Sequence, residues 1–178
     1  MSLIDNAMPW GGLKRVVIAP DHSIVGYLHP QNSNKWEDGT DVNWQDIESA
    51  GYNVMVEIPK FYYTKKVDGD RVYFGVADKV PSDTDVPPYD WEVHPAFFRD
   101  RTKHLDDSTA NPVEVSHRYI GAFHGWVDEQ GRLRSLPYKM PTANKRIGEF
   151  RNHAKNNGVG WSQFDYYLLY AIQLLYIV

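Results

Sequence analysis

The first part of the chain alternates short apolar runs with polar turn signals, which is typical of antiparallel hairpins. Residues 13–19 form an apolar run with a basic start, residues 20–23 resemble a turn, and residues 24–28 form a second apolar run. This pattern predicts a first hairpin.

A second hairpin is predicted further along. Residues 54–58 alternate as a strand does, Pro59 cannot donate to the ladder, and residues 60–67 resume the pattern. Asp68 and Gly69 then form a turn signal, because glycine accepts a positive φ, and residues 71–77 are the expected return strand.

Two polar stretches lack this periodicity. Residues 29–51 are rich in Asn, Asp and Gly and hold Trp36 and Trp44 as isolated aromatics, whereas residues 78–112 are rich in Pro and Asp. We expect the first stretch to be irregular, either as a functional loop or as a long connection.

The last third changes from strand patterns to helix patterns. Residues 118–127 and 132–136 are predicted to be strands joined by a turn. Thr142 is expected to cap an amphipathic helix that runs through Asn156. Residues 162–165 match a capping box, and residues 166–176 are apolar on nearly every side, which predicts a central buried helix.

Composition narrows the functional classes. The 178 residues are 42% hydrophobic, and 19 basic against 23 acidic residues leave a net charge of -4 without long runs. This balance argues against a surface for nucleic acid or anionic membranes. The absence of cysteine excludes disulfides and thiol chemistry. The densest apolar run, residues 166–178, is too short to span a bilayer, so we expect a soluble protein.

Four motifs carry a resemblance to a known class of proteins. In chain order they are Asn-Val-Met-Val-Glu-Ile-Pro-Lys-Phe-Tyr-Tyr at 53–63, His-Pro-Ala-Phe at 94–97, Tyr-Ile-Gly-Ala-Phe at 119–123 and Gly-Val-Gly-Trp at 158–161. In this order and spacing they resemble a module of phage tail and prophage structural proteins that has a C-type-lectin-like fold and serves host attachment. The resemblance covers roughly residues 14–178.

The resemblance implies an α+β, C-type-lectin-like mixed fold with antiparallel hairpins and two helices near the C-terminus. It implies a single domain over residues 13–178, preceded by an N-terminal extension or vector-derived residues at 1–12. Such relatives continue with further strands beyond the segment that matches residues 169–178, so we expect the domain to be incomplete at its C-terminus.

The resemblance does not bring catalytic or metal chemistry with it. The same broad fold includes formylglycine-generating enzymes, whose copper-binding cysteines have no counterpart in this chain. Calcium-dependent lectins of the fold use a Glu-Pro-Asn or Gln-Pro-Asp loop, to which residues 111–114, Asn-Pro-Val-Glu, are only loosely similar. Because calcium needs about six to eight oxygen ligands, we assign no calcium site there.

Other candidate chemistry is equally nonspecific. His94, His104, His117 and His124 lie near Asp106 and Asp107 in the sequence, but no pair has the spacing of a helical metal site. Asp90 and Glu92 flank Trp91 in the manner of a glycosidase acid pair, yet in a strand they would face the same side without distinct roles. We therefore predict no enzymatic activity, no metal and no cofactor.

Five aromatic residues in polar surroundings are the candidate ligand-binding residues: Trp36, Trp44, Trp91, Trp126 and Tyr138. Their neighbours are Asn, Asp, Gln, Lys and His, and such mixtures stack on the apolar faces of sugars while hydrogen-bonding the hydroxyls. For any single tryptophan, sealing a loop against the core is the more frequent role.

Two functions from different classes remain open. The first is a non-catalytic host-attachment domain of a phage or prophage tail, made in the bacterial cytoplasm and residing in the virion. It would bind a bacterial cell-surface saccharide or protein, and presentation in several copies would add avidity. The second is a structural tail or baseplate domain that packs against other tail subunits or forms a homo-oligomer. The first predicts a shallow polar groove rimmed by aromatics, the second a large apolar patch, and neither involves nucleic acid or membrane insertion.

Overall fold

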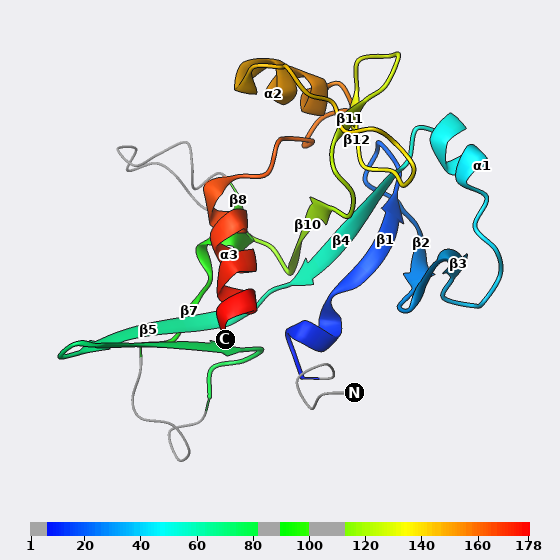
Figure 1. The fold of residues 1–178 in the computed structure, drawn as a ribbon. Helices are drawn as coiled ribbons and strands as arrows, with labels where there is room; N and C mark the ends of the chain where they lie inside the picture. The colour runs from blue at the N-terminus through cyan, green and yellow to red at the C-terminus, as the bar shows by residue number, and fades with distance from the viewer. Residues whose placement is uncertain (1–6, 82–89, 100–112) are drawn as a thin grey trace. The chain divides into compact units, whose positions relative to one another are not determined.

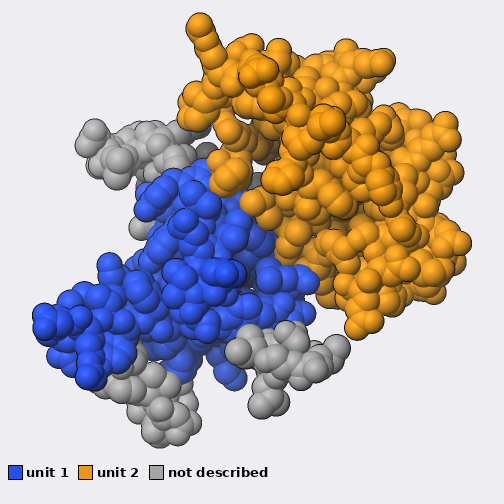
Figure 2. Space-filling model, in the orientation of Figure 1, with its two compact units in different colours: residues 1–13, 58–118, 165–178 blue, residues 14–57, 119–164 orange. Residues whose placement is uncertain are grey.

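The computed structural model describes residues 7–81, 90–99 and 113–178, which form a mixed α/β structure with mostly antiparallel sheets and, within these ranges, three α-helices (Figure 1). The chain divides into two compact units (Figure 2). Unit 1 comprises residues 1–13, 58–118 and 165–178, and unit 2 comprises residues 14–57 and 119–164.

A five-stranded sheet in the order β10-β4-β1-β2-β3 organises unit 2. Its strands are β1 (Lys14–Ile18), β2 (Ile24–His29), β3 (Asn32–Trp36), β4 (Asn53–Pro59) and β10 (His117–Gly121), of which residues 58–59 and 117–118 belong to unit 1. The predicted first hairpin is confirmed, because β1 and β2 pair antiparallel with Val16 opposite Tyr27.

The predicted second hairpin is also confirmed and lies in unit 1. Strands β5 (Tyr62–Asp68) and β6 (Arg71–Ala77) pair along their whole length. Gly69 in the turn has a φ of 57°, a left-handed conformation that favours glycine. The short strand β7 (Glu92–Val93) pairs with the other side of β5, giving the order β6-β5-β7. Strands β8 (Phe98–Arg99) and β9 (Val113–Glu114) form a separate ladder.

The prediction of an irregular segment over residues 29–51 is wrong. This segment contains β3 and the helix α1 (Trp44–Ser49). Asn43 begins α1, because its side-chain oxygen accepts hydrogen bonds from the backbone N–H groups of Gln45 and Asp46 at 3.1 and 3.4 Å. Pairing with β2 overrides the weak strand propensity of the polar sequence in β3.

The single strand predicted over residues 118–127 is interrupted. After β10 the chain forms β11 (Trp126–Val127), which pairs with β12 (Leu133–Arg134) across the predicted turn. Between β10 and β11, the Phe123 N–H donates to the Ser135 hydroxyl at 2.9 Å. A side-chain acceptor therefore replaces regular ladder pairing at that point.

The helix α2 (Ile147–Lys155) begins later than the predicted cap at Thr142. The Thr142 hydroxyl accepts a hydrogen bond from the backbone N–H of Val127 at 2.8 Å, so it fixes the loop to β11 instead of capping the helix. At the observed start, the Glu149 carboxylate accepts from the Arg146 N–H at 2.7 Å.

The predicted final helix is present as α3 (Tyr166–Ile177), but the prediction of burial on nearly every side is wrong. Leu168, Ala171 and Leu174 are buried, whereas Tyr166 and Tyr176 are 73% and 91% exposed. The cap is Asp165, the last residue of the predicted capping box, whose carboxylate accepts from the Leu168 N–H at 2.8 Å. Among the described residues, no helix has the length and apolar character needed to cross a membrane.

Each unit has its own core. In unit 1, the buried side chains of Phe61, Phe97 and His94 contact one another, with ring centroids 5.1 to 6.5 Å apart. In unit 2 the core is a cluster of aliphatic side chains, namely Val17, Leu28, Ile47, Val54 and Leu136.

Candidate binding site

Four of the five aromatic residues predicted to bind a ligand lie in unit 2. Trp36 ends β3, Trp44 begins α1, Trp126 lies in β11 and Tyr138 lies in the loop after β12. Trp91 belongs to unit 1.

Asn34 joins two of these aromatic residues. Its side-chain oxygen accepts hydrogen bonds from the Trp44 indole N–H at 2.9 Å and from the Tyr138 hydroxyl at 3.3 Å. An indole N–H is only a donor, which fixes the amide oxygen of Asn34 as the shared acceptor. Asn34 is itself held in β3, because its backbone carbonyl accepts from the Val42 N–H at 2.9 Å.

Tyr138 is both exposed and conformationally unusual. Its side chain is 81% exposed, and its backbone φ is 60°. A bulky residue in this left-handed region costs on the order of 1 kcal/mol or more and persists where the surrounding structure holds it. The hydroxyl contact to Asn34 tethers a ring that is presented to solvent instead of being packed into the core.

Lys139 connects Trp126 with α1. Its Nζ lies 4.6 Å from the centroid of the Trp126 ring and 2.6 Å from Glu48 Oε1. Because this ion pair is partly exposed, it contributes little to stability. The pair places charged groups beside an aromatic face, and small-molecule sites combine aromatic side chains with a few placed polar groups.

We call Asn34, Trp44, Trp126, Tyr138 and Lys139 the Asn34 cluster. Trp36 is not part of it, since its ring packs on Gly26, where an added Cβ would meet a ring carbon at 2.8 Å. Trp36, Trp44 and Trp126 all pack against the aliphatic core of unit 2. Trp44 and Trp126 therefore cover the core of unit 2 and also belong to the Asn34 cluster.

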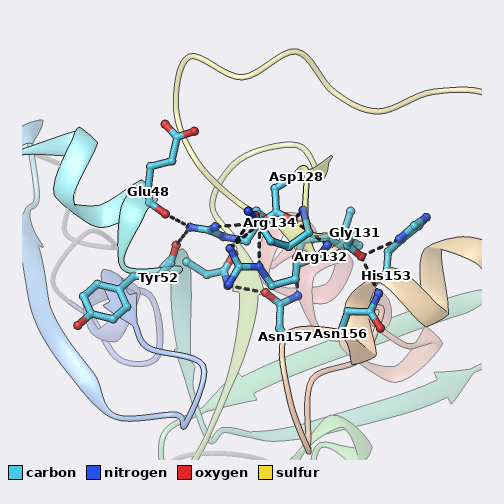
Figure 3. Close-up of polar contacts among 12 residues, drawn as sticks. Glu48, Tyr52, Asp128, Gly131, Arg132, Arg134, His153, Asn156 and Asn157 are labelled. Atoms are coloured by element: carbon cyan, nitrogen blue, oxygen red, sulfur yellow. Dashed lines mark hydrogen bonds and ion pairs between the residues drawn. The ribbon is translucent and has the colours of Figure 1, made fainter.

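A buried ion-pair network holds the backbone that precedes the loop carrying Tyr138 and Lys139 (Figure 3). Arg134 is 1% exposed and donates to Asp128 Oδ2 at 3.1 Å and to the carbonyl oxygens of Tyr52 and Glu48 at 2.6 and 3.4 Å. Arg132 Nε donates to the same carboxylate oxygen at 2.8 Å. Burial raises the pKa of Asp128, but hydrogen bonds from Arg132 and Arg134 outweigh burial and hold this pKa below its usual value.

Buried amides extend the network to α2. The side chain of Asn53 donates to Asn157 Oδ1 at 3.2 Å and accepts from the Ser135 N–H at 2.9 Å. The side chain of Asn157 donates to the Leu133 carbonyl at 2.8 Å. Residues 133–135 are therefore fixed on both sides, and the loop carrying Tyr138 and Lys139 departs from a defined backbone.

Trp91 lines a pocket of ≈ 380 Å³ in unit 1. Its ring lies over Gly75, where an added Cβ would meet a ring carbon at 2.7 Å. Thr64, Lys66 and Tyr73 also line this pocket, on the same face of the β5–β6 hairpin. The surroundings of Trp91 are mainly apolar, unlike the amide-centred arrangement in unit 2.

The remaining candidate residues have structural contacts. Glu92 accepts a hydrogen bond from the Tyr63 hydroxyl at 2.6 Å, and Asp90 precedes β7. His94 is buried, and its Nδ1 accepts from the Ala96 N–H at 3.2 Å. Within the described ranges no three His, Cys, Asp or Glu side chains are grouped to hold a metal ion. Outside those ranges lie His104, Asp106, Asp107 and residues 111–112.

Sequence analysis missed Asn34, Glu48 and Lys139. Lys139 directly follows Tyr138, so its place in the sequence could have indicated that it lies near the predicted site. Asn34 had none, because its partners approach from α1 and from the loop after β12.

No protein-family model matches this sequence, and no curated protein or solved structure matches the chain. The function is therefore inferred from the residues of the site, and the resemblance to phage tail modules stays a prediction.

Proposed function

We propose that the protein is a non-catalytic attachment domain of a phage or prophage tail, and that its Asn34 cluster binds a saccharide on a bacterial cell surface. The observation that carries the proposal is the shared acceptor at Asn34, which orients Trp44 and the exposed Tyr138. Sugar rings bind to aromatic faces flanked by hydrogen-bonding groups, and both are present in this cluster.

The charges of the cluster also favour binding over hydrolysis. Glycoside hydrolysis generally uses two carboxyl groups about 5 to 10 Å apart, one of them protonated. The carboxylate that contacts the Asn34 cluster, that of Glu48, is paired with Lys139 at 2.6 Å. A small exposed site of this kind binds weakly by itself, and presentation in several copies would supply the avidity that attachment needs.

The test is a screen followed by a titration. Purified bacterial lipopolysaccharides, capsular polysaccharides and teichoic acids are arrayed, and each binder is titrated while tryptophan fluorescence is recorded. Tyr138→Gly removes the ring but accepts the observed φ of 60°. We expect it to weaken binding about tenfold, the effect of losing one stacking contact.

The matched control is Tyr176→Ala, which removes a 91% exposed tyrosine ring from unit 1. It should leave the affinity unchanged. The proposal is rejected if no arrayed saccharide binds the wild type, or if both variants weaken binding equally.

Asn34 is expected to act as a positioning residue. Asn34→Ala removes the acceptor of both hydrogen bonds, so the Trp44 and Tyr138 rings lose their fixed orientation. Asn34→Asp keeps an acceptor oxygen and should restore most of the affinity. Equal losses in the two variants would contradict this role.

A structural role in a tail or baseplate is the second candidate function. It is favoured by apolar side chains that unit 1 exposes, namely Val72, Tyr73 and Phe74 on β6 and Tyr166, Tyr176 and Ile177 on α3. Exposed apolar side chains mark interaction surfaces where they form a contiguous patch. This candidate predicts stable association in light scattering and no fluorescence response to any arrayed saccharide.

A further inference from the structure

Strand β6 forms an edge of the three-stranded sheet in unit 1, and among the described residues no strand pairs with its outer side. Natural edges are commonly protected by short length, proline, lysine or a bulge. The sequence of β6, Arg-Val-Tyr-Phe-Gly-Val-Ala, has 7 residues with neither proline nor lysine. Its pairing with β5 runs without a register shift from Tyr62 opposite Ala77 to Asp68 opposite Arg71.

The side chains of β6 are also unusually apolar for an edge. Val72, Tyr73 and Phe74 are 49%, 41% and 38% exposed. On the opposite side, β7 has only 2 residues and pairs with Tyr62 and Tyr63 alone. The rest of that side of β5 carries Lys65 and Lys66, and lysines disfavour the addition of a strand. The outer side of β6 is therefore the part of this sheet best able to accept another strand.

We propose that β6 pairs antiparallel with β6 of a second copy of this chain, with the two-fold axis at Phe74. A two-fold axis places one residue opposite its own copy and pairs each preceding residue with the equivalent following one. The resulting pairs are Phe74 with Phe74, Tyr73 with Gly75, Val72 with Val76 and Arg71 with Ala77.

The side chains of β6 are complementary in this register. Val72, Phe74 and Val76 share one face of the strand, so two copies form a continuous apolar row. On the other face Tyr73 lies opposite Gly75, which the Trp91 ring of its own chain already covers, so the fit of this register depends on the apolar face. Beyond the ends of β6, Asp70 would face Asp78, and this repulsion limits the ladder to the strand itself.

The neighbouring registers fit less well. With Gly75 at the axis, glycine faces glycine and Val72 faces Asp78. With Tyr73 at the axis, Arg71 faces Gly75 and Asp70 faces Val76. Because registers centred on a single residue can all satisfy the backbone hydrogen bonds, side-chain fit selects the axis at Phe74 among them. The strand is thus complementary to itself, and this identifies a second copy as the partner.

The chain contains no cysteine, so single-cysteine variants report one contact each. In the proposed register Phe74→Cys lies opposite its own copy, at a Cβ separation of about 4.5 to 5.5 Å, close to disulfide reach. We expect a disulfide-linked dimer under mild oxidation. The control is Val67→Cys, which is 62% exposed and lies on the same hairpin but on β5, away from the outer side of β6. It should cross-link at least about tenfold more slowly.

The register has its own test, which also serves if Phe74→Cys does not fold. Val72→Cys and Val76→Cys should cross-link with each other when mixed, and faster than either variant alone. Light scattering of the wild type should show a dimer that Phe74→Lys converts to a monomer, with Val67→Lys as the control that stays dimeric.

A wild type that stays monomeric at about 100 μM, or cross-linking of Phe74→Cys no faster than that of Val67→Cys, would overturn the proposal. The dimer does not depend on the proposed saccharide site. The monomeric Phe74→Lys variant should keep the intrinsic affinity for a soluble saccharide, so the two proposals can fail separately.

Discussion

The two units stabilise their interiors by different means. Unit 2 buries the charged pair of Arg134 and Asp128 together with the amides of Asn53 and Asn157. Unit 1 buries mainly ring contacts, such as that between Phe61 and Phe97 with centroids 5.3 Å apart. A buried network of directional hydrogen bonds favours one geometry, whereas apolar packing tolerates more variation. The unit with fixed loops carries the proposed binding site, and the unit with an apolar core exposes an apolar strand edge.

Asp128→Ala is the strongest test of this contrast between the interiors of the two units. This substitution leaves the buried guanidinium of Arg134 without its carboxylate partner, and breaking a buried ion pair costs about 3–5 kcal/mol. We expect that loss in the free energy of unfolding from urea denaturation. Fluorescence of tryptophans in unit 2 provides the signal.

The control is Asp41→Ala, which removes an exposed carboxylate paired with Lys35 at 2.9 Å. An exposed pair contributes at most about 1 kcal/mol. If the two variants were equally stable, the buried network would not be what holds unit 2. The double variant Asp128→Ala/Arg134→Met should recover part of the loss, because it removes the unpaired charge.

The pH dependence of stability is a second test of whether the buried pair of Asp128 and Arg134 stabilises unit 2. The pKa of Asp128 is lower in the folded protein than its value of about 3.9 in an unfolded chain. The carboxylate therefore contributes stability that is present above pH 3.9 or so and is lost as the pH falls toward the folded pKa. Asp128→Asn cannot titrate at this position, so its unfolding free energy should decrease less steeply below about pH 5. Parallel curves for the variant and the wild type would contradict the assignment.

The sequence predicted those parts of the fold that local signals determine. The turn at Asp68 and Gly69 lies between two strands of alternating pattern, and the hairpin follows from these residues alone. Strand β3 has the polar sequence Asn-Ser-Asn-Lys-Trp and becomes a strand because β2 lies beside it. Thr142 has the chemistry of a cap but bonds to Val127, a contact that depends on tertiary structure.

The residues of the proposed binding site were predictable to a similar extent. Aromatic residues in polar surroundings included Trp44, Trp126 and Tyr138, which the structure places in one unit. Asn34 was missed because an asparagine in a polar segment gives no signal until its partners are known. The predicted turn brings Arg134 near Asp128, but the sequence could not reveal that Arg134 is buried or that the Tyr52 and Glu48 carbonyls accept its other hydrogen bonds, since these come from a distant part of the chain.

The smallest expected effect concerns the polar contacts of unit 1. Asp165 caps α3 through its bond with the Leu168 N–H, and its other oxygen lies 3.0 Å from Arg118 Nη2. Asp165→Ala should lower the free energy of unfolding by about 1 kcal/mol, the usual cost of losing a cap. Asp165→Ser keeps a capping oxygen and loses only the partly exposed ion pair, so it should cost less. Both are measured by urea denaturation beside Asp128→Ala.

The helix keeps its buried face of Leu168, Ala171 and Leu174 in either variant, which is why a modest loss is expected. A loss in Asp165→Ala as large as that in Asp128→Ala would mean that unit 1 also depends on directional polar contacts, and the contrast between the two units would disappear.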